Sequence, residues 1–263
     1  FVKQWSGIAK NIEYYWLYNE ASVYEVVQKT YKKHLSEIKE RFPRIRIPEL
    51  IATIKEKNRL LIMTEFVEGN DLEDAPSENG MQVIEEAISF FNFISTRIDP
   101  DEAKKLTRRS TTYIICNFFL MTVRSIIRIP KKSSFFIQGI VFFVKRIPSV
   151  WKTRDLILVH RDITFYNILV GGGYIYLIDF ELAVLTHPVV ELTQIMTGSW
   201  RREGFWQSFY KTKTMETLFE NREHNNAYWA LSVYTAVHRL ATCVPEELPL
   251  HYSYLTHSLS YEQ

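Results

Sequence analysis

Three polar side chains, Asp162, Asn167 and Asp179, stand at the ends of short apolar runs in the sequence. Asp162 follows the run 156–159 and His160, Asn167 comes five residues later where a second run begins, and Asp179 closes a third run. Apolar runs of this length predict strands, and tight turns bring strand ends to one edge of a sheet. We therefore expect the three side chains to lie together.

Phosphoryl transfer to a hydroxyl group needs this set of side chains. A carboxylate orients the attacking hydroxyl or accepts its proton, and oxygen ligands hold the magnesium that bridges the nucleotide phosphates. Asp162 suits the first role, and Asn167 and Asp179 suit the second. Each of them alone would be an ordinary turn residue, so the prediction depends on the joint pattern.

That pattern consists of His-x-Asp, four residues, Asn, an apolar strand, a glycine turn, a second apolar strand and Asp-Phe, in HRDITFYNIL and IDFE. It resembles the catalytic and metal-binding segments of the protein-kinase-like superfamily. The resemblance implies an ATP- and Mg²⁺-dependent kinase with Asp162 as base, Asn167 and Asp179 as metal ligands, and His160 as a scaffold residue. It covers nearly the whole chain, but its specific motifs lie mainly between His160 and Glu181.

Details of the motif favour a small-molecule kinase over a protein kinase. Thr164 stands where protein serine/threonine kinases carry a lysine, and Glu181 replaces the glycine of their Asp-Phe-Gly segment. Pro188 and the helix-like VVELTQIM leave little room for an activation loop, and no Ala-Pro-Glu follows. IDFE is similar to the metal-binding segment of choline kinases and aminoglycoside phosphotransferases. Glu191 is the nearest match to the aspartate that braces the catalytic loop in those families.

The N-terminal residues resemble the nucleotide-binding half of the same fold. Lys3 resembles the strand lysine that contacts the phosphates, and Glu20 resembles the helix glutamate that pairs with it. The other interpretations are a solvated terminal lysine and a carboxylate at a helix start, where the helix dipole favours it.

LLIMTEFVEG resembles the last strand and the hinge of that half, so the resemblance implies that backbone groups of Glu65, Phe66 and Val67 bind adenine. The glycine-rich loop that should precede Lys3 is absent from this sequence, which begins at Phe1 rather than Met. Either native sequence upstream is missing or the protein lacks the loop.

The resemblance, together with the remaining patterns, implies an α+β, two-lobed, protein-kinase-like fold with a truncated β-rich N-lobe, residues 1–68, and a mainly helical C-lobe, residues 69–263. Three consecutive glycines, 171–173, predict a hairpin turn and not a phosphate cradle, because strands flank them on both sides. The other expected elements are strands at FVKQW, 49–55 and 60–66, a turn at KEKNR, and helices at about 20–38, 82–98 and 225–243. In the first helix we expect one apolar face formed by Val23, Val27, Tyr31 and Leu35.

Composition limits the class of protein. A net charge of +2 over 263 residues gives no reason to expect nucleic-acid binding. Cys116 and Cys243 lie in apolar surroundings without metal-ligand spacing, which predicts reduced core thiols and a cytoplasmic protein. No signal pattern is present, and no apolar run approaches the ~20 residues needed to span a bilayer.

The stretch 112–151 alternates apolar runs with arginines and lysines. Two interpretations stand. One is a pair of buried core helices with solvated basic ends, and the other is a peripheral contact with a membrane surface, because basic residues beside apolar faces suit anionic headgroups.

Three functions follow from these observations. The first is a kinase for a small molecule or sugar. The second is a kinase for a membrane glycolipid such as a lipopolysaccharide core sugar. The third is an inactive, pseudokinase-like binding module, against which the retained catalytic side chains argue. The acceptor and the oligomeric state do not follow from the sequence, and Trp200, Trp206 and Trp229 suit an acceptor pocket or a plain core.

Overall fold

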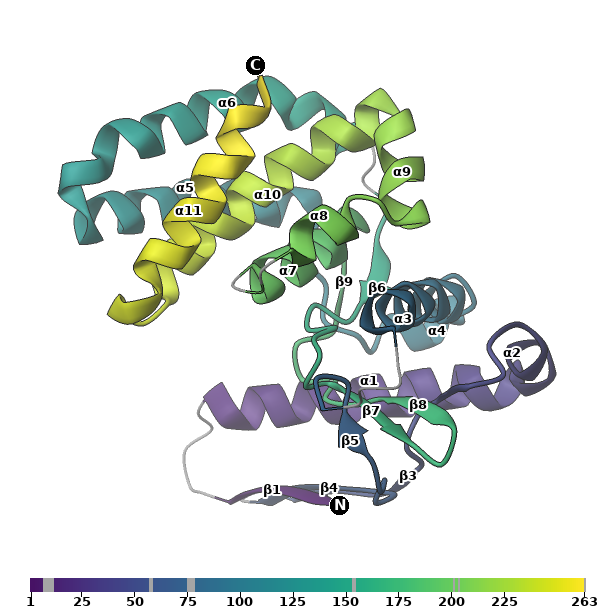
Figure 1. Ribbon diagram of the computed structural model, residues 1–263. Helices are drawn as coiled ribbons and strands as arrows, with labels where there is room; N and C mark the ends of the chain where they lie inside the picture. The colour runs from purple at the N-terminus through teal and green to yellow at the C-terminus, as the bar shows by residue number, and fades with distance from the viewer. Residues whose placement is uncertain are drawn as a thin grey trace. The chain divides into compact units, whose positions relative to one another are not determined.

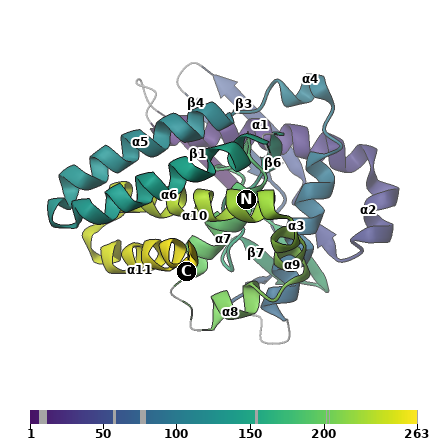
Figure 2. The same cartoon turned by 90° about the horizontal axis from the view of Figure 1, so that it is seen from above.

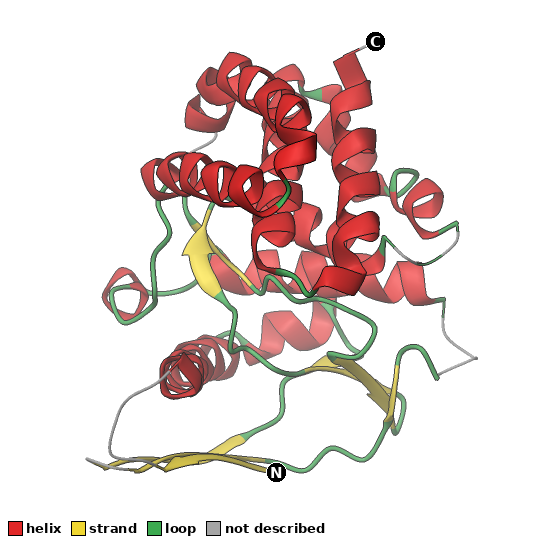
Figure 3. Cartoon of the chain, turned by 90° about the vertical axis from the view of Figure 1, so that its left-hand side faces the viewer, coloured by secondary structure: helices red, strands yellow, loops and turns green. Residues whose placement is uncertain are grey.

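The computed structural model describes residues 1–6, 12–56, 59–74, 79–152, 155–200, 202 and 204–262 (Figure 1). The chain forms two compact units: the first contains Phe1–Arg108 and Ile157–Leu185, and the second contains Arg109–Leu156 and Thr186–Gln263. Helices predominate among the described residues and the strands form small sheets (Figure 3), which confirms the α+β class. The lobe boundary at residue 68 stays a prediction.

The first unit combines helices with three small sheets. Its helices are α1 (Ile12–Lys33), α2 (Leu35–Arg41), α3 (Gly80–Ser95) and α4 (Pro100–Ala103). Its strands are β1 (Val2–Ser6), β2 (Ile45–Arg46), β3 (Leu50–Glu56), β4 (Arg59–Thr64), β5 (Asn70–Asp71), β6 (Ile157–Val159), β7 (Ile168–Gly171), β8 (Tyr174–Leu177) and β9 (Val184–Thr186). The sheet orders are β1-β4-β3, β2-β8-β7-β5 and β6-β9.

Helix α1 packs on the first sheet through a small apolar cluster. Trp5 of β1 and Leu60 and Ile62 of β4 are buried together with Leu17 and Ala21 of α1. Strand side chains alternate between the two faces of a sheet, so the residue two positions before Trp5 shares its face. That residue is Lys3, and its side chain therefore points toward α1.

The first helix differs from the prediction. The expected helix 20–38 begins earlier, at Ile12, and ends at Lys33; His34 is a turn, and Leu35 belongs to α2 and not to the predicted face. The aromatic residues before Glu20 have modest helix propensity, but tertiary contacts such as the Trp5–Tyr14 ring contact at 4.8 Å outweigh that preference. Part of the turn expected at KEKNR, residues 57 and 58, lies outside the described residues.

The β7–β8 hairpin confirms the glycine turn. Gly171 pairs with Tyr174, and Gly172 and Gly173 between them have φ values of 58° and 81°. Positive φ at both central residues is the requirement of a type I′ turn, which glycine meets without steric cost. Strand β5 pairs with β7 on one side, and β2 runs parallel to β8 on the other.

The second unit is helical and is built around one buried helix, α10. Helices α5, α6, α7 and α11 all pack against it. Figure 2 shows α5 and α6 side by side, so the stretch 112–151 is a helical hairpin. The elements are α5 (Thr111–Arg128), η1 (Pro130–Lys132), α6 (Ser133–Lys152), α7 (Val189–Ser199), α8 (Phe205–Phe209), α9 (Lys213–Glu220), α10 (Arg222–Thr242), η2 (Pro245–Glu247), α11 (Leu248–Leu259) and η3 (Ser260–Glu262).

The two cysteines correct the expectation of core thiols. Both are free, as predicted, but Cys116 is exposed on α5 and Cys243 is only half-buried after α10. The apolar run around Cys116 predicts a core segment, but one side of α5 faces solvent, and Cys116 lies on that side.

Gly171 offers a test of backbone packing in the second sheet. A Cβ atom at Gly171 would lie 2.1 Å from the Glu68 carbonyl oxygen, whereas one at Gly172 would meet nothing within 4 Å and would cost only the positive φ. Because the clash at Gly171 is with backbone, we expect Gly171→Ala to lower the free energy of unfolding by about 3 kcal/mol or more, and Gly172→Ala by only about 1 kcal/mol. Urea denaturation of both variants checks this, and equal losses would contradict it.

Candidate functional site

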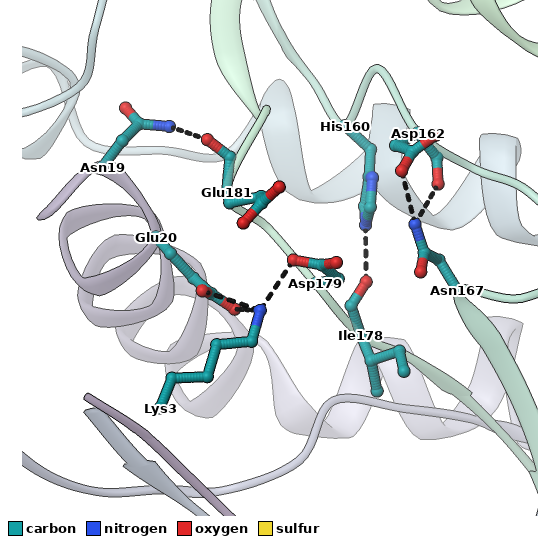
Figure 4. Close-up of polar contacts among 9 residues, drawn as sticks. All are labelled: Lys3, Asn19, Glu20, His160, Asp162, Asn167, Ile178, Asp179 and Glu181. Carbon is teal, nitrogen blue, oxygen red and sulfur yellow. Dashed lines mark hydrogen bonds and ion pairs between the residues drawn. The ribbon is translucent and has the colours of Figure 1, made fainter. Parts of the chain in front are cut away.

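Lys3 joins three elements of the first unit. Its ammonium nitrogen Nζ lies 3.0 Å from both carboxylate oxygens of Glu20 in α1 and 2.8 Å from Asp179 Oδ1, just after β8 (Figure 4). The predicted approach of Lys3 and Glu20 is therefore present. The second carboxylate, from Asp179, was expected as a metal ligand only, and its contact with Lys3 links segments 176 residues apart.

The charges of this group depend on burial. Burial opposes the charged form of Lys3, but the carboxylates of Glu20 and Asp179 outweigh it and hold the pKa of Lys3 above its ordinary value. Burial also raises the pKa of Glu20 to about 7, against the opposing effect of Lys3. Glu20 therefore takes up a proton as the pH falls below about 7, and above that pH it is a charged partner of Lys3.

Asp179 is held in a strained backbone conformation. Its φ of 64° is in the left-handed region, which is unusual for residues other than glycine. The next residue, Phe180, is fully buried, with its ring against Tyr24 of α1 at 4.7 Å and Phe91 of α3 at 5.9 Å. The buried ring fixes the chain directly after the strained residue and so helps to direct the Asp179 carboxylate toward Lys3.

Asn19 is a positioning residue that the sequence analysis missed. Its amide nitrogen donates hydrogen bonds to the carbonyl oxygens of Glu181 at 2.9 Å and Ala183 at 2.8 Å, and its Oδ1 accepts one from the Thr107 hydroxyl at 2.7 Å. Asn19 thus fastens the segment after Asp179 to α1. Its only signal in the sequence is its place next to Glu20.

The loop that carries Asp162 is tied to the strand end that carries Asp179. Asn167 donates from Nδ2 to the Asp162 carbonyl oxygen at 3.0 Å and to Asp162 Oδ2 at 2.7 Å. The backbone carbonyl oxygen of Asn167 accepts a hydrogen bond from the Ile178 N–H at 3.2 Å. Figure 4 shows Asp179 between Lys3 and this loop, so Asp162, Asn167 and Asp179 gather at one place in the first unit.

His160 connects the same loop to the segment after β8. It is buried, and burial lowers the pKa of its imidazole, so the ring is neutral at pH 7. Nε2 lies 3.0 Å from the Ile178 carbonyl oxygen, which can only accept, so Nε2 carries the proton. Arg161, between His160 and Asp162, has a φ of 68° and is the second strained residue of the site.

A cavity of about 250 Å³ lies beside these groups in the first unit. Lys3, Glu20 and Asp179 line one part of it, and the predicted hinge segment 65–67 lines another. Ile62, Leu169 and Ile178 are among its apolar lining residues, whereas Asp162 and Asn167 do not line it. Glu65 already donates its backbone N–H to the Glu49 carbonyl oxygen at 2.7 Å, so a ligand would have to use other backbone groups of the segment.

The donor set fits a magnesium ion. Glu20, Asp179 and Glu181 each offer a carboxylate oxygen, and these oxygens lie within 4.8 Å of one another. Asn167 uses its amide nitrogen on Asp162, which leaves its side-chain oxygen to accept or to ligate. Carboxylate and amide oxygens are the ligands that Mg²⁺ prefers. Glu181 was not among the predicted ligands; it stands in the motif position that the sequence assigned to a missing glycine.

Four predicted residues belong to the second unit. Glu191 is buried in the first turn of α7, and its bracing role stays a prediction. The rings of Trp200 and Trp206 stack with centroids 5.9 Å apart, and Trp229 is buried and stacks on Tyr261 at 3.8 Å. The three tryptophans therefore take part in an extensive aromatic cluster.

The raised pKa of Glu20 gives a prediction for stability. The folded protein holds a proton on Glu20 that the unfolded chain releases between pH 4.5 and about 7, so the free energy of unfolding falls as the pH rises through this window. The loss is on the order of 3 kcal/mol. Glu20→Gln should remove this dependence of the free energy of unfolding on pH. Glu25→Gln, a change at an exposed residue of the same helix, should keep it. Urea denaturation across the window measures both; a wild-type slope in Glu20→Gln would contradict the assignment.

Comparisons with known proteins show which folds this chain resembles. A thermostable mutant of aminoglycoside phosphotransferase APH(4)-Ia, in ternary complex with AMP-PNP and hygromycin B, has a TM-score of 0.57 and 13% identity over 85% of this chain and 78% of that one. Choline kinase from Cryptosporidium parvum Iowa II has a TM-score of 0.51 and 12% identity over 88% and 77%. No curated protein sequence gives a significant match. The kinase-like fold predicted from the sequence is confirmed.

The family follows from the sequence match. The model of the phosphotransferase enzyme family matches residues 33–213, which contain the loop from His160 to Glu181 but neither Lys3 nor Glu20. The assignment of Lys3 and Glu20 to the site therefore rests on the geometry described above and not on the family match. Because the match spans more than half of the chain, the protein belongs to the phosphotransferase enzyme family.

Proposed function

We propose that this phosphotransferase moves the γ-phosphate of ATP, in the presence of Mg²⁺, to a hydroxyl group of a small molecule or sugar. The observation that carries the proposal is the ion pair between Lys3 and Asp179, 2.8 Å long. It places a cation suited to phosphate beside a carboxylate suited to magnesium, at the edge of a cavity with apolar walls.

The nucleotide would occupy that cavity. Its adenine would lie between apolar residues such as Ile62 and Leu169, against backbone groups of Glu65, Phe66 and Val67. Its phosphates would extend toward Lys3, whose raised pKa keeps the ammonium charged. Nucleotide binding is supported by a structure of similar fold, the aminoglycoside phosphotransferase in ternary complex with AMP-PNP and hygromycin B.

The chemical step would depend on Asp162. Its carboxylate would orient the acceptor hydroxyl and take its proton as the oxygen attacks the γ-phosphorus atom and the bond to the β-phosphate oxygen breaks. Asn167 holds Asp162 Oδ2 by a 2.7 Å hydrogen bond and so fixes the direction of the carboxylate. Asp179 and Asn167 would hold the magnesium, which neutralises charge on the phosphates. His160, neutral and buried, keeps this loop next to Ile178.

The class of acceptor is open to one alternative. A membrane glycolipid, such as a lipopolysaccharide core sugar, would require the chain to reach a membrane surface, and the basic and apolar stretch 112–151 is the observation that supports this alternative. ATP as donor and two free cysteines favour a cytoplasmic site of action. An inactive binding module would have no chemical need for Asp162, which argues for the enzyme.

The role of Asp162 is tested by turnover. Asp162→Asn keeps the shape of the side chain but cannot accept the proton, so we expect kcat to fall by roughly 10²- to 10⁴-fold with nucleotide affinity nearly unchanged. Asp74→Asn, the same change at an exposed aspartate of the first unit, should behave like wild type. The assay is magnesium-dependent ATP consumption by the full-length protein with candidate acceptors. Equal turnover in the two variants would exclude Asp162 as the base.

The role of Asp179 is tested by binding. Asp179→Asn removes a metal-ligating charge, so the part of the ATP affinity that depends on magnesium should fall by about tenfold or more. Calorimetry measures the ATP affinity once with Mg²⁺ and once with EDTA. The lost contact with Lys3 changes the affinity in both conditions, whereas the lost metal ligand changes it only with Mg²⁺. Magnesium-dependent binding equal to wild type, together with no turnover on any acceptor, would favour the pseudokinase-like binding module.

A further inference from the structure

The charges of the chain are distributed very unevenly. The 52 residues from Ala103 to Arg154 contain twelve lysines and arginines and no aspartate or glutamate, whereas the other 211 residues contain 20 basic and 30 acidic side chains. The net charge of the whole chain is low because a strongly basic segment is offset by the acidic remainder of the chain. Most of this segment is the hairpin formed by α5, η1 and α6.

The outer face of α5 is an apolar stripe. Its exposed apolar side chains recur every three or four residues, which is the spacing of one helix face. Leu120 is 62% exposed and Ile127 is 76% exposed. The other members of the stripe are Tyr113, Cys116 and Val123.

Helix α6 presents a second stripe of the same kind. Ile137, Val141, Val144 and Trp151 are exposed and share one face of the helix. The exposed Lys131 and Lys132 stand between the two helices, in η1. Large exposed apolar patches with a polar border are uncommon on monomeric soluble proteins and mark protein or membrane interaction sites.

The inner faces of both helices are already occupied. Phe118 of α5 and Phe143 of α6 are buried with their ring centroids 4.0 Å apart. The Ser125 hydroxyl donates to the Val237 carbonyl oxygen of α10 at 3.2 Å, and Arg128 Nη1 donates to that of Leu240 at 3.0 Å. The hairpin is therefore fixed on α10, and only its outer face is available to a partner.

The packing of the hairpin on α10 limits the ways in which its two helices could contact a lipid bilayer. No single described helix is long and apolar enough to cross a membrane; Thr111–Arg128 and Pro130–Lys152 reach that length and composition only together, across a bend of 118°. Because the inner faces are packed on α10, a lipid contact would use one face of each helix, which is the geometry of a helix that lies in the membrane interface.

We propose that the outer face of the α5–η1–α6 hairpin docks on a membrane surface that contains anionic lipid. The stripes around Leu120, Ile127 and Val141 enter the boundary between headgroups and acyl chains. Arg124 and Lys131 contact the anionic headgroups. The proposal rests on the charge and exposure of the second unit and not on the nucleotide chemistry of the first.

A second copy of the chain fits this face less well. A symmetric dimer would place the basic hairpin against itself, and neither copy has an acidic residue between Ala103 and Arg154 to pair with the other's cations. An anionic surface supplies both the apolar medium and the opposite charge.

The test is flotation of the full chain with vesicles of phosphatidylcholine, alone or mixed with phosphatidylglycerol. We expect partition into the anionic vesicles only, weakening as salt is added. Leu120→Gln with Ile127→Gln should lower it roughly tenfold or more. Arg124→Gln with Lys131→Gln should lower it about tenfold.

Two matched controls lie in the first unit. Ile12→Gln with Ile51→Gln changes two apolar side chains that are each 61% exposed, and Lys33→Gln with Lys39→Gln removes the same charge as the hairpin variant. Both controls should partition like wild type. Circular dichroism and thermal melting confirm that every variant is folded.

Three outcomes would overturn the proposal. The first is no partition into anionic vesicles at low salt. The second is partition that the Leu120 and Ile127 changes leave intact. The third is a wild-type dimer in analytical ultracentrifugation that becomes monomeric with those changes and does not bind vesicles, which would make the face an interface between copies. None of these outcomes concerns ATP consumption, so the proposed phosphotransferase reaction is tested separately.

Discussion

The candidate site depends on one ammonium group shared by two carboxylates. Lys3 comes from a strand, Glu20 from a helix and Asp179 from the loop after β8, and each element is held by contacts of its own. Trp5 packs β1 against α1, and Phe180 fixes the chain beside Asp179. Without Lys3, the buried carboxylate of Glu20 would face that of Asp179 with no cation between them, which is unfavourable. The lysine is therefore both the expected phosphate contact and the group that makes the arrangement of carboxylates stable.

The sequence predicted which polar side chains lie together better than it predicted the residues that hold them in place. Asp162, Asn167 and Asp179 could be found because a polar residue at the end of an apolar strand stands out, and their common place follows from the geometry of a hairpin. Glu20 could be found through its spacing from Lys3. The ion pair between Lys3 and Asp179 could not, because it joins residues that are distant in sequence and depends on how the sheet packs on α1.

The errors have physical causes. Helix α1 begins eight residues before the predicted start because aromatic packing outweighs the local propensity of its first turns. Asn19 was missed because an asparagine on a helix gives no signal until the carbonyl groups that it binds are placed next to it. Cys116 was assigned to the core because an apolar run does not show which face of its helix is buried when both faces are apolar, as on α5.

The proposed reaction requires one of the two ion pairs of Lys3 to give way. An ammonium that is neutralised by two carboxylates has little charge left for a phosphate, so an entering nucleotide must compete with one of them. Glu20 has a side chain only 3% exposed and offers both oxygens, whereas Asp179 is 30% exposed and contributes one oxygen. Interactions with a solvated partner are weaker than those with a buried one. The contact with Asp179 is therefore the one that phosphate would displace, and its release would free the carboxylate that the proposal assigns to the metal.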